Sequence, residues 1–231
     1  MFDISPTEWT AILLSLRVAT VATLVATPLG IAVAWLLARR EFWGKALLDA
    51  LIHLPLVLPP VVTGYLLLLT FGRRGMVGAW LADHLGLVFA FRWTGAALAC
   101  GIMAFPLLVR PIRLSIEAVD RRLEQAAATL GASPLSVFLT VTLPLAFPGV
   151  LAGMVLGFAK AIGEFGATIT FVSNIPGETQ TISSAIYSLI QTPDGDTAAL
   201  RLVVVSILIA TAALVASEWF ARRALKRLHG N

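Results

Sequence analysis

Five long apolar stretches restrict what this chain can fold into. A helix needs about 20 mainly apolar residues to cross the hydrocarbon core of a membrane, and each stretch reaches or approaches that length with few charges. Charged residues make up only 13% of the sequence, against about 25% in soluble domains. We therefore expect an all-α integral membrane protein with one transmembrane domain over residues 1–231. The predicted spans are residues 18–38, 50–72, 93–109, 144–169 and 198–221.

Proline residues lie inside most of these spans. Each removes one backbone hydrogen bond, which is tolerable in a membrane when neighbouring helices satisfy the freed carbonyl. We therefore expect a kink at each of Pro28, Pro55, Pro59, Pro60, Pro106 and Pro148.

Lys and Arg concentrate on one side of the predicted spans, and cytoplasmic loops carry an excess of both residues. We therefore expect the N-terminus outside and the C-terminus in the cytoplasm. This distribution accounts for the net charge of +4 without a nucleic-acid partner, and residues 163–199 on the outside contain no Lys or Arg. The acidic start of the chain does not resemble a signal peptide, so we expect the first span to be retained. The basic residues assigned to the cytoplasm are Arg39, Arg40, Lys45, Arg110, Arg113, Arg121, Arg122, Arg222, Arg223, Lys226 and Arg227.

Residues 117–143 form a polar, alanine-rich segment on the predicted cytoplasmic side, between the third and fourth spans. Residues 117–130 favour helix, and Gly131 can end that helix in a left-handed conformation. Ser133 followed by Pro134 is typical of the start of a new helix. The small side chains would let a cytoplasmic partner approach closely. Equally, the first helix would suit a loop that lies on the membrane surface.

The spacing within this segment resembles the EAA loop of ABC importer permeases, in which Glu-Ala-Ala is followed by three residues, Gly, nine residues and Ile-x-Leu-Pro. This chain has Gln125 where Glu is usual, although Glu124 stands beside it, and Val141 where Ile is usual. The resemblance implies a coupling helix that docks on an ATP-binding subunit. The residues that the resemblance assigns to ATPase coupling are Glu124, Gln125, Ala126, Ala127, Gly131, Val141, Leu143 and Pro144.

Three further stretches resemble molybdate permease subunits of the same superfamily, with sulfate permeases as near relatives. They are HLPLVLPPVVTGY at residues 53–65, FGRRG at 71–75 and GEFGATITFVSNIPGETQTISSAIY at 163–187. The resemblance implies a type I ABC importer permease fold in the bacterial inner membrane and a role as the transmembrane subunit of a molybdate import system. The implied partners are a second copy of the chain, two copies of an ATP-binding subunit and a periplasmic molybdate-binding protein.

The chain carries no ATP-binding motif of its own, because no GxxxxGK[ST] occurs in it. ATP and Mg are therefore expected on the separate ATPase, and we expect neither enzyme activity nor a bound cofactor in this chain. Five spans without an internal repeat are few to enclose a pathway, which favours a symmetric dimer.

Other functions remain open at this point. The chain would also suit a permease for sulfate or tungstate, or a secondary anion transporter that works alone. A membrane-embedded enzyme is disfavoured because no catalytic set is visible, and the histidines lack metal-ligand spacing. These are His53, His84 and His229.

Three charged residues are candidates for the transport pathway. Lys160 and Glu164 lie four residues apart in the outer half of the fourth span. An ionisable side chain inside the membrane costs free energy, so its presence there indicates a functional role. They would line or gate the pore, or form a pair that reaches the outer interface. Arg17 opens the first span and has the chemistry to attract an oxyanion. Because Arg17 lies at the edge of the membrane, the favoured interpretation is that its side chain extends toward the membrane–water interface.

Two further features concern packing and the outer surface. One face of the fourth span has a GxxxGxxxG pattern, formed by Gly149, Gly153 and Gly157. This pattern allows two helices to pack closely, and the dimer axis is one place where such packing could occur. A direct ligand contact is the less favoured use. Residues 168–181 are rich in Thr, Ser and Asn and would contact a binding protein, close an outer gate or form a solvated loop. We expect a short amphipathic helix over residues 182–190 after them.

Overall fold

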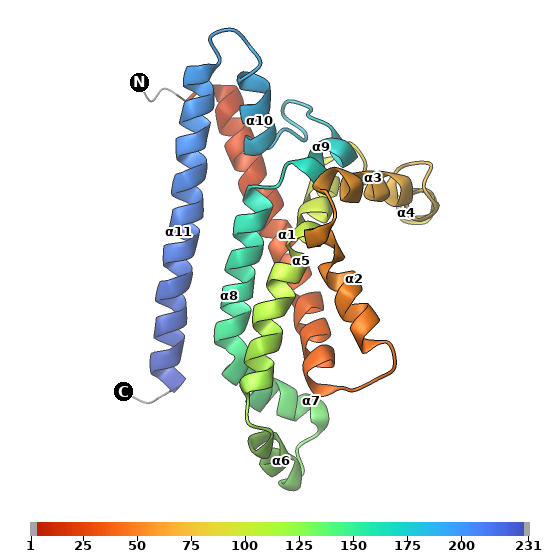
Figure 1. The fold of residues 1–231 in the computed structure, drawn as a ribbon, viewed down its shortest axis with the longest axis vertical. Helices are drawn as coiled ribbons and strands as arrows, with labels where there is room; N and C mark the ends of the chain where they lie inside the picture. Colours follow the sequence, from red (N-terminus) through yellow and green to blue (C-terminus); the bar gives the residue numbers. More distant parts are fainter. Residues whose placement is uncertain (1–3, 229–231) are drawn as a thin grey trace.

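The protein is an all-helical bundle in a computed structural model that describes residues 4–228. For residues 217–218 and 220–228 only the backbone is described, so the side chains of Arg222, Arg223, Lys226 and Arg227 lie outside the described part. Four long helices run side by side and define the long axis of the molecule (Figure 1). They are α1 (Pro6–Arg39), α5 (Trp93–Ala118), α8 (Leu143–Ile162) and α11 (Asp196–Leu228).

Three of these helices are longer than the apolar stretches that predicted them, and α11 exceeds its predicted span of residues 198–221 at both ends. Ser5 caps α1, because its hydroxyl accepts a hydrogen bond from the Glu8 backbone N–H while the Glu8 carboxylate accepts one from the Ser5 N–H. The helix therefore begins 12 residues before the predicted span at residue 18. Similarly, α5 continues through Pro106 and Pro111 to Ala118. The residues in these extensions include charged and polar ones, so a search for apolar stretches does not find the extensions.

The predicted span over residues 50–72 is not one continuous helix, and it bends sharply where kinks were expected at Pro59 and Pro60. The segment forms α2 (Lys45–Val57) and α3 (Pro60–Phe71), whose axes differ by 114°. Leu58 and Pro59 between them are extended, with ψ of 144° and 132°, because a residue before proline is disfavoured in the helical region. As a result, α2 points along the bundle while α3 lies across its upper end (Figure 1).

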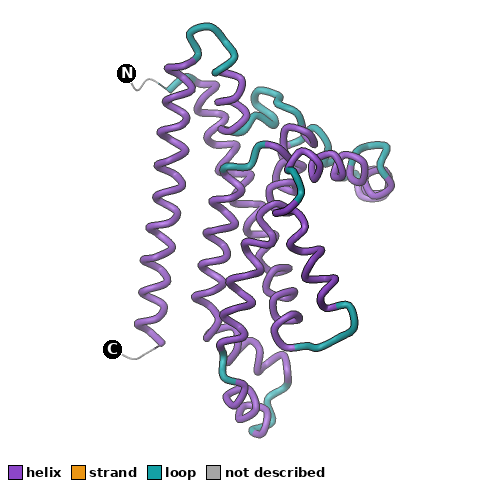
Figure 2. The backbone as a smooth tube through the Cα atoms, viewed as in Figure 1, coloured by secondary structure: helices purple, strands orange, loops and turns teal. Residues whose placement is uncertain are grey.

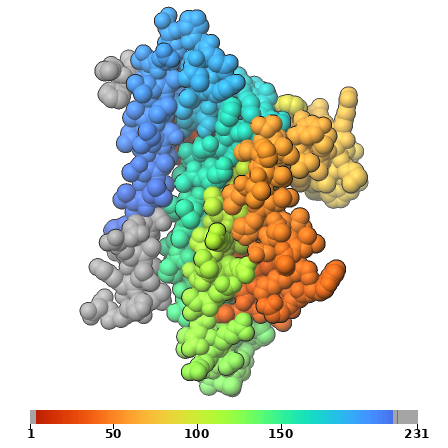
Figure 3. Space-filling view, in the orientation of Figure 1, coloured from red at the N-terminus to blue at the C-terminus, as the bar shows by residue number. Residues whose placement is uncertain are grey.

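The upper end of the molecule in Figure 1 carries some of the short helices. α3 is followed by α4 (Met76–Leu85), and both project from the bundle as a lateral arm (Figure 3). α3 packs against α9 (Gly166–Val172). Farther along the chain, α10 (Ile182–Leu189) packs against α1 and α11, close to the predicted bounds of residues 182–190. Loops join the helices almost entirely at the two ends of the bundle (Figure 2).

The fourth predicted span, residues 144–169, does not continue to residue 169 as one helix. α8 stops at Ile162, and α9 begins at Gly166 after a break at residues 163–165. In the other direction, the helix starts earlier than predicted. α7 (Pro134–Val137) and a π-helical turn, η1 (Phe138–Thr142), lead into α8 without interruption.

The core lies between α1, α5 and α8. Toward the upper end it contains small residues such as Ala19 and Ala96 with Phe171 of α9. Toward the lower end it contains Leu37, Leu108 and other aliphatic side chains. α11 packs against α8 and leaves most of its length exposed. Such exposed apolar surface is expected of a helix that faces lipid or another membrane subunit.

Candidate functional site

The segment that resembles a coupling loop forms a separate unit at the lower end of the bundle, beyond α5 and α8 (Figure 1). It comprises α6 (Arg121–Thr129), α7 and η1. The predicted helix over residues 117–130 is interrupted at Val119, where the backbone turns extended. Asp120 then caps α6 by accepting a hydrogen bond from the Arg122 backbone N–H at 2.9 Å.

The connection from α6 to α7 has the local chemistry that the sequence indicates. Gly131 has φ of 86°, the left-handed conformation that glycine adopts most easily. Ser133 caps α7, because its hydroxyl accepts a hydrogen bond from the Ser136 N–H at 3.3 Å, and Pro134 occupies the first turn. Only Gly131 and Ala132 therefore separate the flanking positions of the two helices, Leu130 and Ser133.

α6 has no buried residue and presents an open surface. Gln125 and Ala126 are exposed, and Ala127 is half-buried. Leu130, just after the helix, is 89% exposed. Val141, Leu143 and Pro144 lie on the return path, where Val141 and Leu143 are half-buried and Pro144 is exposed. Small and apolar side chains therefore face away from the protein at this end.

Glu124 faces the opposite way. Its Oε1 atom accepts hydrogen bonds from Arg39 Nη2 at 2.9 Å, Arg39 Nε at 3.2 Å and Thr142 Oγ1 at 2.6 Å. Arg39 Nη2 also donates to the carbonyl of Val119 at 3.1 Å. The side chains of Arg39 and Glu124 are 9% and 19% exposed. We call this set of four residues the Glu124 cluster.

A cavity of about 350 Å³ lies between the lower end of α1 and the segment formed by α6, α7 and η1. Trp35 and Phe138 line it and meet edge to face, with ring centroids 6.1 Å apart. Arg40 also lines it and lies 5.7 Å from the centre of the Trp35 ring. The cavity is thus positively charged and aromatic next to the exposed Gln125.

Lys160 and Glu164 do form an ion pair, with Nζ and Oε2 2.6 Å apart. The Glu164 side chain is only 1% exposed, whereas that of Lys160 is 29% exposed. The Glu164 Oε1 atom also accepts a hydrogen bond from the Ala167 backbone N–H at 3.0 Å, in the first turn of α9. Glu164 therefore fastens the break between α8 and α9, and only Lys160 reaches open space.

Arg17 lies elsewhere, on the exposed side of α1. Its guanidinium lies 3.8 Å from the centre of the Trp93 ring, at the start of α5. Such cation–π contacts are common for arginine. The contact joins the interior of α1, which begins at Pro6, to the first residue of α5.

The glycine face of α8 packs against α5 of the same chain. A Cβ atom at Gly149 would lie 2.7 Å from the Pro111 carbonyl oxygen, and one at Gly153 would lie 2.6 Å from that of Leu108. Gly157 has more room, because the nearest atom would be 3.7 Å away. The close approach at Gly149 and Gly153 is thus internal to one chain.

Within the predicted segment 168–181, residues 168–172 belong to α9, and the loop after them is held by hydrogen bonds within itself and to α10. Asn174 Nδ2 donates to Ser188 Oγ of α10 at 2.6 Å, and Thr179 Oγ1 accepts from the Ile175 backbone N–H at 2.9 Å. The loop is therefore joined to the outer helices. No group of three His, Cys, Asp or Glu residues suited to a metal ion occurs within residues 4–228, and His229 lies outside this range.

Comparison with known proteins assigns the chain to a family. Residues 26–226 match the family described as binding-protein-dependent transport system inner membrane component. The chain belongs to this family of permeases. It is 60% identical over 220 residues to the molybdenum transport system permease protein ModB of Escherichia coli K12, covering 95% of this chain and 96% of the relative. It is 58% identical to ModB of Haemophilus influenzae over 221 residues, covering 96% of each.

Solved structures support the same fold at much lower identity. A bacterial ABC transporter that imports alginate aligns with a TM-score of 0.74 at 17% identity, covering 95% of this permease and 80% of that chain. The MetNI methionine ABC transporter in an inward-facing conformation aligns with a TM-score of 0.72 at 15% identity, covering 95% and 98%. The permease therefore has the fold of type I ABC importer membrane subunits.

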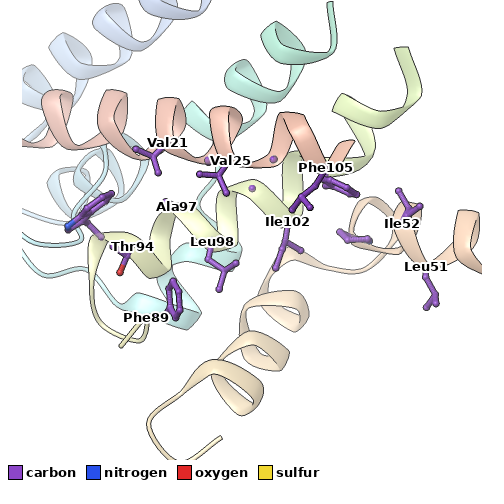
Figure 4. A pocket seen from close by; sticks show the side chains of 16 residues that line it. Val21, Val25, Leu51, Ile52, Phe89, Thr94, Ala97, Leu98, Ile102 and Phe105 are labelled. Atoms are coloured by element: carbon purple, nitrogen blue, oxygen red, sulfur yellow. The ribbon is translucent and has the colours of Figure 1, made fainter. Parts of the chain in front are cut away.

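An apolar groove of about 640 Å³ runs along the permease between α1, α2 and α5 (Figure 4). Val21 and Val25 of α1 face Ile102 and Phe105 of α5 across it, and Ile52 of α2 lies near its far end (Figure 4). Its lining is aliphatic and aromatic, as suits lipid chains or a neighbouring membrane helix.

Sequence reasoning missed the polar contacts that hold this permease together at its lower end in Figure 1. Arg39 and Arg113 entered the argument only as positive charges, yet Arg39 binds Glu124, and Arg113 binds Asp49 of α2 at 3.1 Å. Arg113 also binds Glu117, four residues along α5, at 2.8 Å. Arg113 and Glu117 could have been paired from their spacing of four residues on one helix, whereas the other two pairs join residues far apart in the sequence and left no local signal.

Proposed function

We propose that this permease is the transmembrane subunit of an ATP-driven molybdate importer. The observation that carries the proposal is the identity of 60% to a molybdenum transport permease across nearly the whole of both chains. Molybdate, rather than sulfate or tungstate, is the proposed substrate for that reason. The exposed Gln125, Ala126 and Leu130 on a helix beyond the bundle give the chain a surface of the kind that an energy-supplying partner needs.

In this proposal the pore forms between two copies of the permease. Two copies of a separate ATPase, which bind ATP and Mg, sit on the surface of α6 and on the return path at Val141, Leu143 and Pro144. A periplasmic molybdate-binding protein delivers the ion at the opposite end, where α10 and residues 168–181 lie. The N-terminus is then periplasmic and the C-terminus cytoplasmic, in agreement with the distribution of Lys and Arg. The permease itself carries no cofactor and catalyses no reaction.

Lys160 is the proposed pathway cation. Its side chain is part-exposed and its charge is only partly offset, because Glu164 is buried beneath it. A positive group of this kind stabilises an oxyanion inside the membrane, where the transfer of an unpaired anion from water costs free energy. Glu164 holds the ammonium in place, and Arg17 is assigned to the outer rim.

The test is uptake of molybdate into proteoliposomes that contain the permease and its ATPase, with the binding protein outside. We expect uptake that requires ATP in the lumen and binding protein outside, and that persists under excess sulfate. Uptake by the permease alone would instead show a channel or secondary carrier. Uptake that excess sulfate abolishes would replace molybdate by sulfate as the substrate.

A further inference from the structure

The Glu124 cluster joins four elements at one carboxylate oxygen. Arg39 is the last residue of α1, Val119 ends α5, Glu124 lies in the first turn of α6, and Thr142 is the last residue before α8. The contacts run from Arg39 to Glu124 and to the Val119 carbonyl, and from Thr142 to Glu124. The inner ends of three long helices are thus connected through α6.

This cluster is the main polar attachment of α6. The helix has no buried residue and packs chiefly against the short elements α7 and η1, which belong to the same cytoplasmic segment. An ion pair with several charge-assisted hydrogen bonds restricts geometry more than a single neutral hydrogen bond does. The negative charge also lies in the first turn of α6, where the helix dipole favours it.

The position of Thr142 ties the cluster to α8 in particular. Its side chain is 1% exposed and ends a π-helical turn, a rare conformation that is frequent at functional sites. The Thr142 hydroxyl donates to Glu124 at 2.6 Å. A displacement of α6 would therefore reach the start of α8 through this bond and the end of α1 through Arg39.

We infer that Glu124 is a positioning residue that connects the coupling helix to α1 and α8, and that it makes no contact with the ATPase. The neighbouring Gln125, which stands where Glu is usual in the EAA loop, is the exposed residue of the two. This inference rests on the proposed function, since it assigns the path by which movement of the ATPase reaches the membrane helices.

The test compares Glu124→Gln with Glu41→Gln in the complete transporter in proteoliposomes. Glu41 is a matched control, because it also forms a cytoplasmic ion pair, with Lys45 at 2.6 Å, but is exposed and bonds only four residues away. Two quantities are measured: the ratio of ATPase to permease after purification, and the number of ATP molecules hydrolysed per molybdate imported.

We expect Glu124→Gln to retain the ATPase at the wild-type ratio and to hydrolyse several-fold more ATP per molybdate, while Glu41→Gln matches the wild type. Exchanging the charges, with Arg39→Glu and Glu124→Arg together, should restore part of the coupling that either single change loses. Thr142→Val, which removes one hydrogen bond and keeps the shape of the side chain, should give a smaller loss in the same direction and remains informative if Glu124→Gln does not fold.

Two results would overturn the inference. Loss of the ATPase from the Glu124→Gln complex, with the permease still monodisperse, would make Glu124 a docking contact. Wild-type coupling in both Glu124→Gln and Thr142→Val would show that the cluster transmits nothing. Failure of the proposed function is distinguishable, because the wild-type complex would then show no ATP-driven uptake in the same assay.

Discussion

The two ends of α8 are fastened in different ways. At the end that we propose lies in the cytoplasm, Glu124 binds Arg39, which lies 85 residues away in the sequence, and both side chains retain some exposure. At the outer end, Glu164 binds Lys160 of the same helix and is almost completely buried. The first attachment joins separate elements and depends on how they lie, whereas the second is local and stabilises a break in the chain. The cytoplasmic end is therefore suited to movement, and the outer end to a fixed shape.

The largest effect on stability is expected at the outer end. Lys160→Met leaves the buried Glu164 carboxylate without its cation, and removing one partner of a buried ion pair costs about 3–5 kcal/mol. Thermal unfolding of the purified permease in detergent measures this loss. Lys160→Met with Glu164→Gln removes both charges and should be less destabilised than Lys160→Met alone. Equal stability of the single variant and the wild type would contradict a buried, partner-dependent Glu164.

An intermediate loss of stability is expected from a substitution within α8 itself. Gly153→Ala places a methyl group against the Leu108 carbonyl, and overpacking of this kind costs about 1–3 kcal/mol. Gly157→Ala is the matched control, because a Cβ atom there meets only ordinary van der Waals contacts. The same unfolding assay should separate the two variants. If both are equally stable, α8 and α5 do not approach as closely as the glycine contacts indicate.

The smallest of these effects is expected at the cytoplasmic end. Thr142→Val removes one hydrogen bond to Glu124 and should cost about 1 kcal/mol, since Arg39 still neutralises the carboxylate. Thr140→Val on the same π-helical turn is the control, because Thr140 is exposed and bonds only to the Ser136 carbonyl. A loss at Thr142 as large as that of Lys160→Met would remove the distinction between the two ends of α8.

Local chemistry was readable from the sequence. The conformation at Gly131 and the cap formed by Ser133 and Pro134 depend on neighbouring residues only, and the structure has both. The membrane class and the permease family followed from apolar stretches and motif spacing. The bend expected at Pro59 and Pro60 is present between α2 and α3, but its size of 114° could not be predicted, because the two prolines are compatible with either a kink or a complete change of direction.

The site was predictable only in part, for a physical reason. The exposed alanines near Gln125 follow from the segment's composition, but the orientation of Glu124 depends on Arg39, and no local pattern pairs residues so far apart in the sequence. For the same reason, Lys160 and Glu164 could be paired from their spacing of four residues, whereas the burial of Glu164 depends on the packing of α9 against the bundle. Long-range contacts thus decided what each carboxylate does.

The most direct test of the account is molybdate uptake by the Ala126→Arg transporter, compared with Ala46→Arg. Both alanines are exposed, and Ala46 lies in the first turn of α2, away from α6. An arginine at position 126 puts a long charged side chain on the surface where the ATPase is proposed to dock. We predict that Ala126→Arg loses the ATPase and ATP-driven uptake while the permease stays folded, and that Ala46→Arg keeps both. Uptake by Ala126→Arg at the wild-type rate would contradict the proposal that this helix receives the energy for transport.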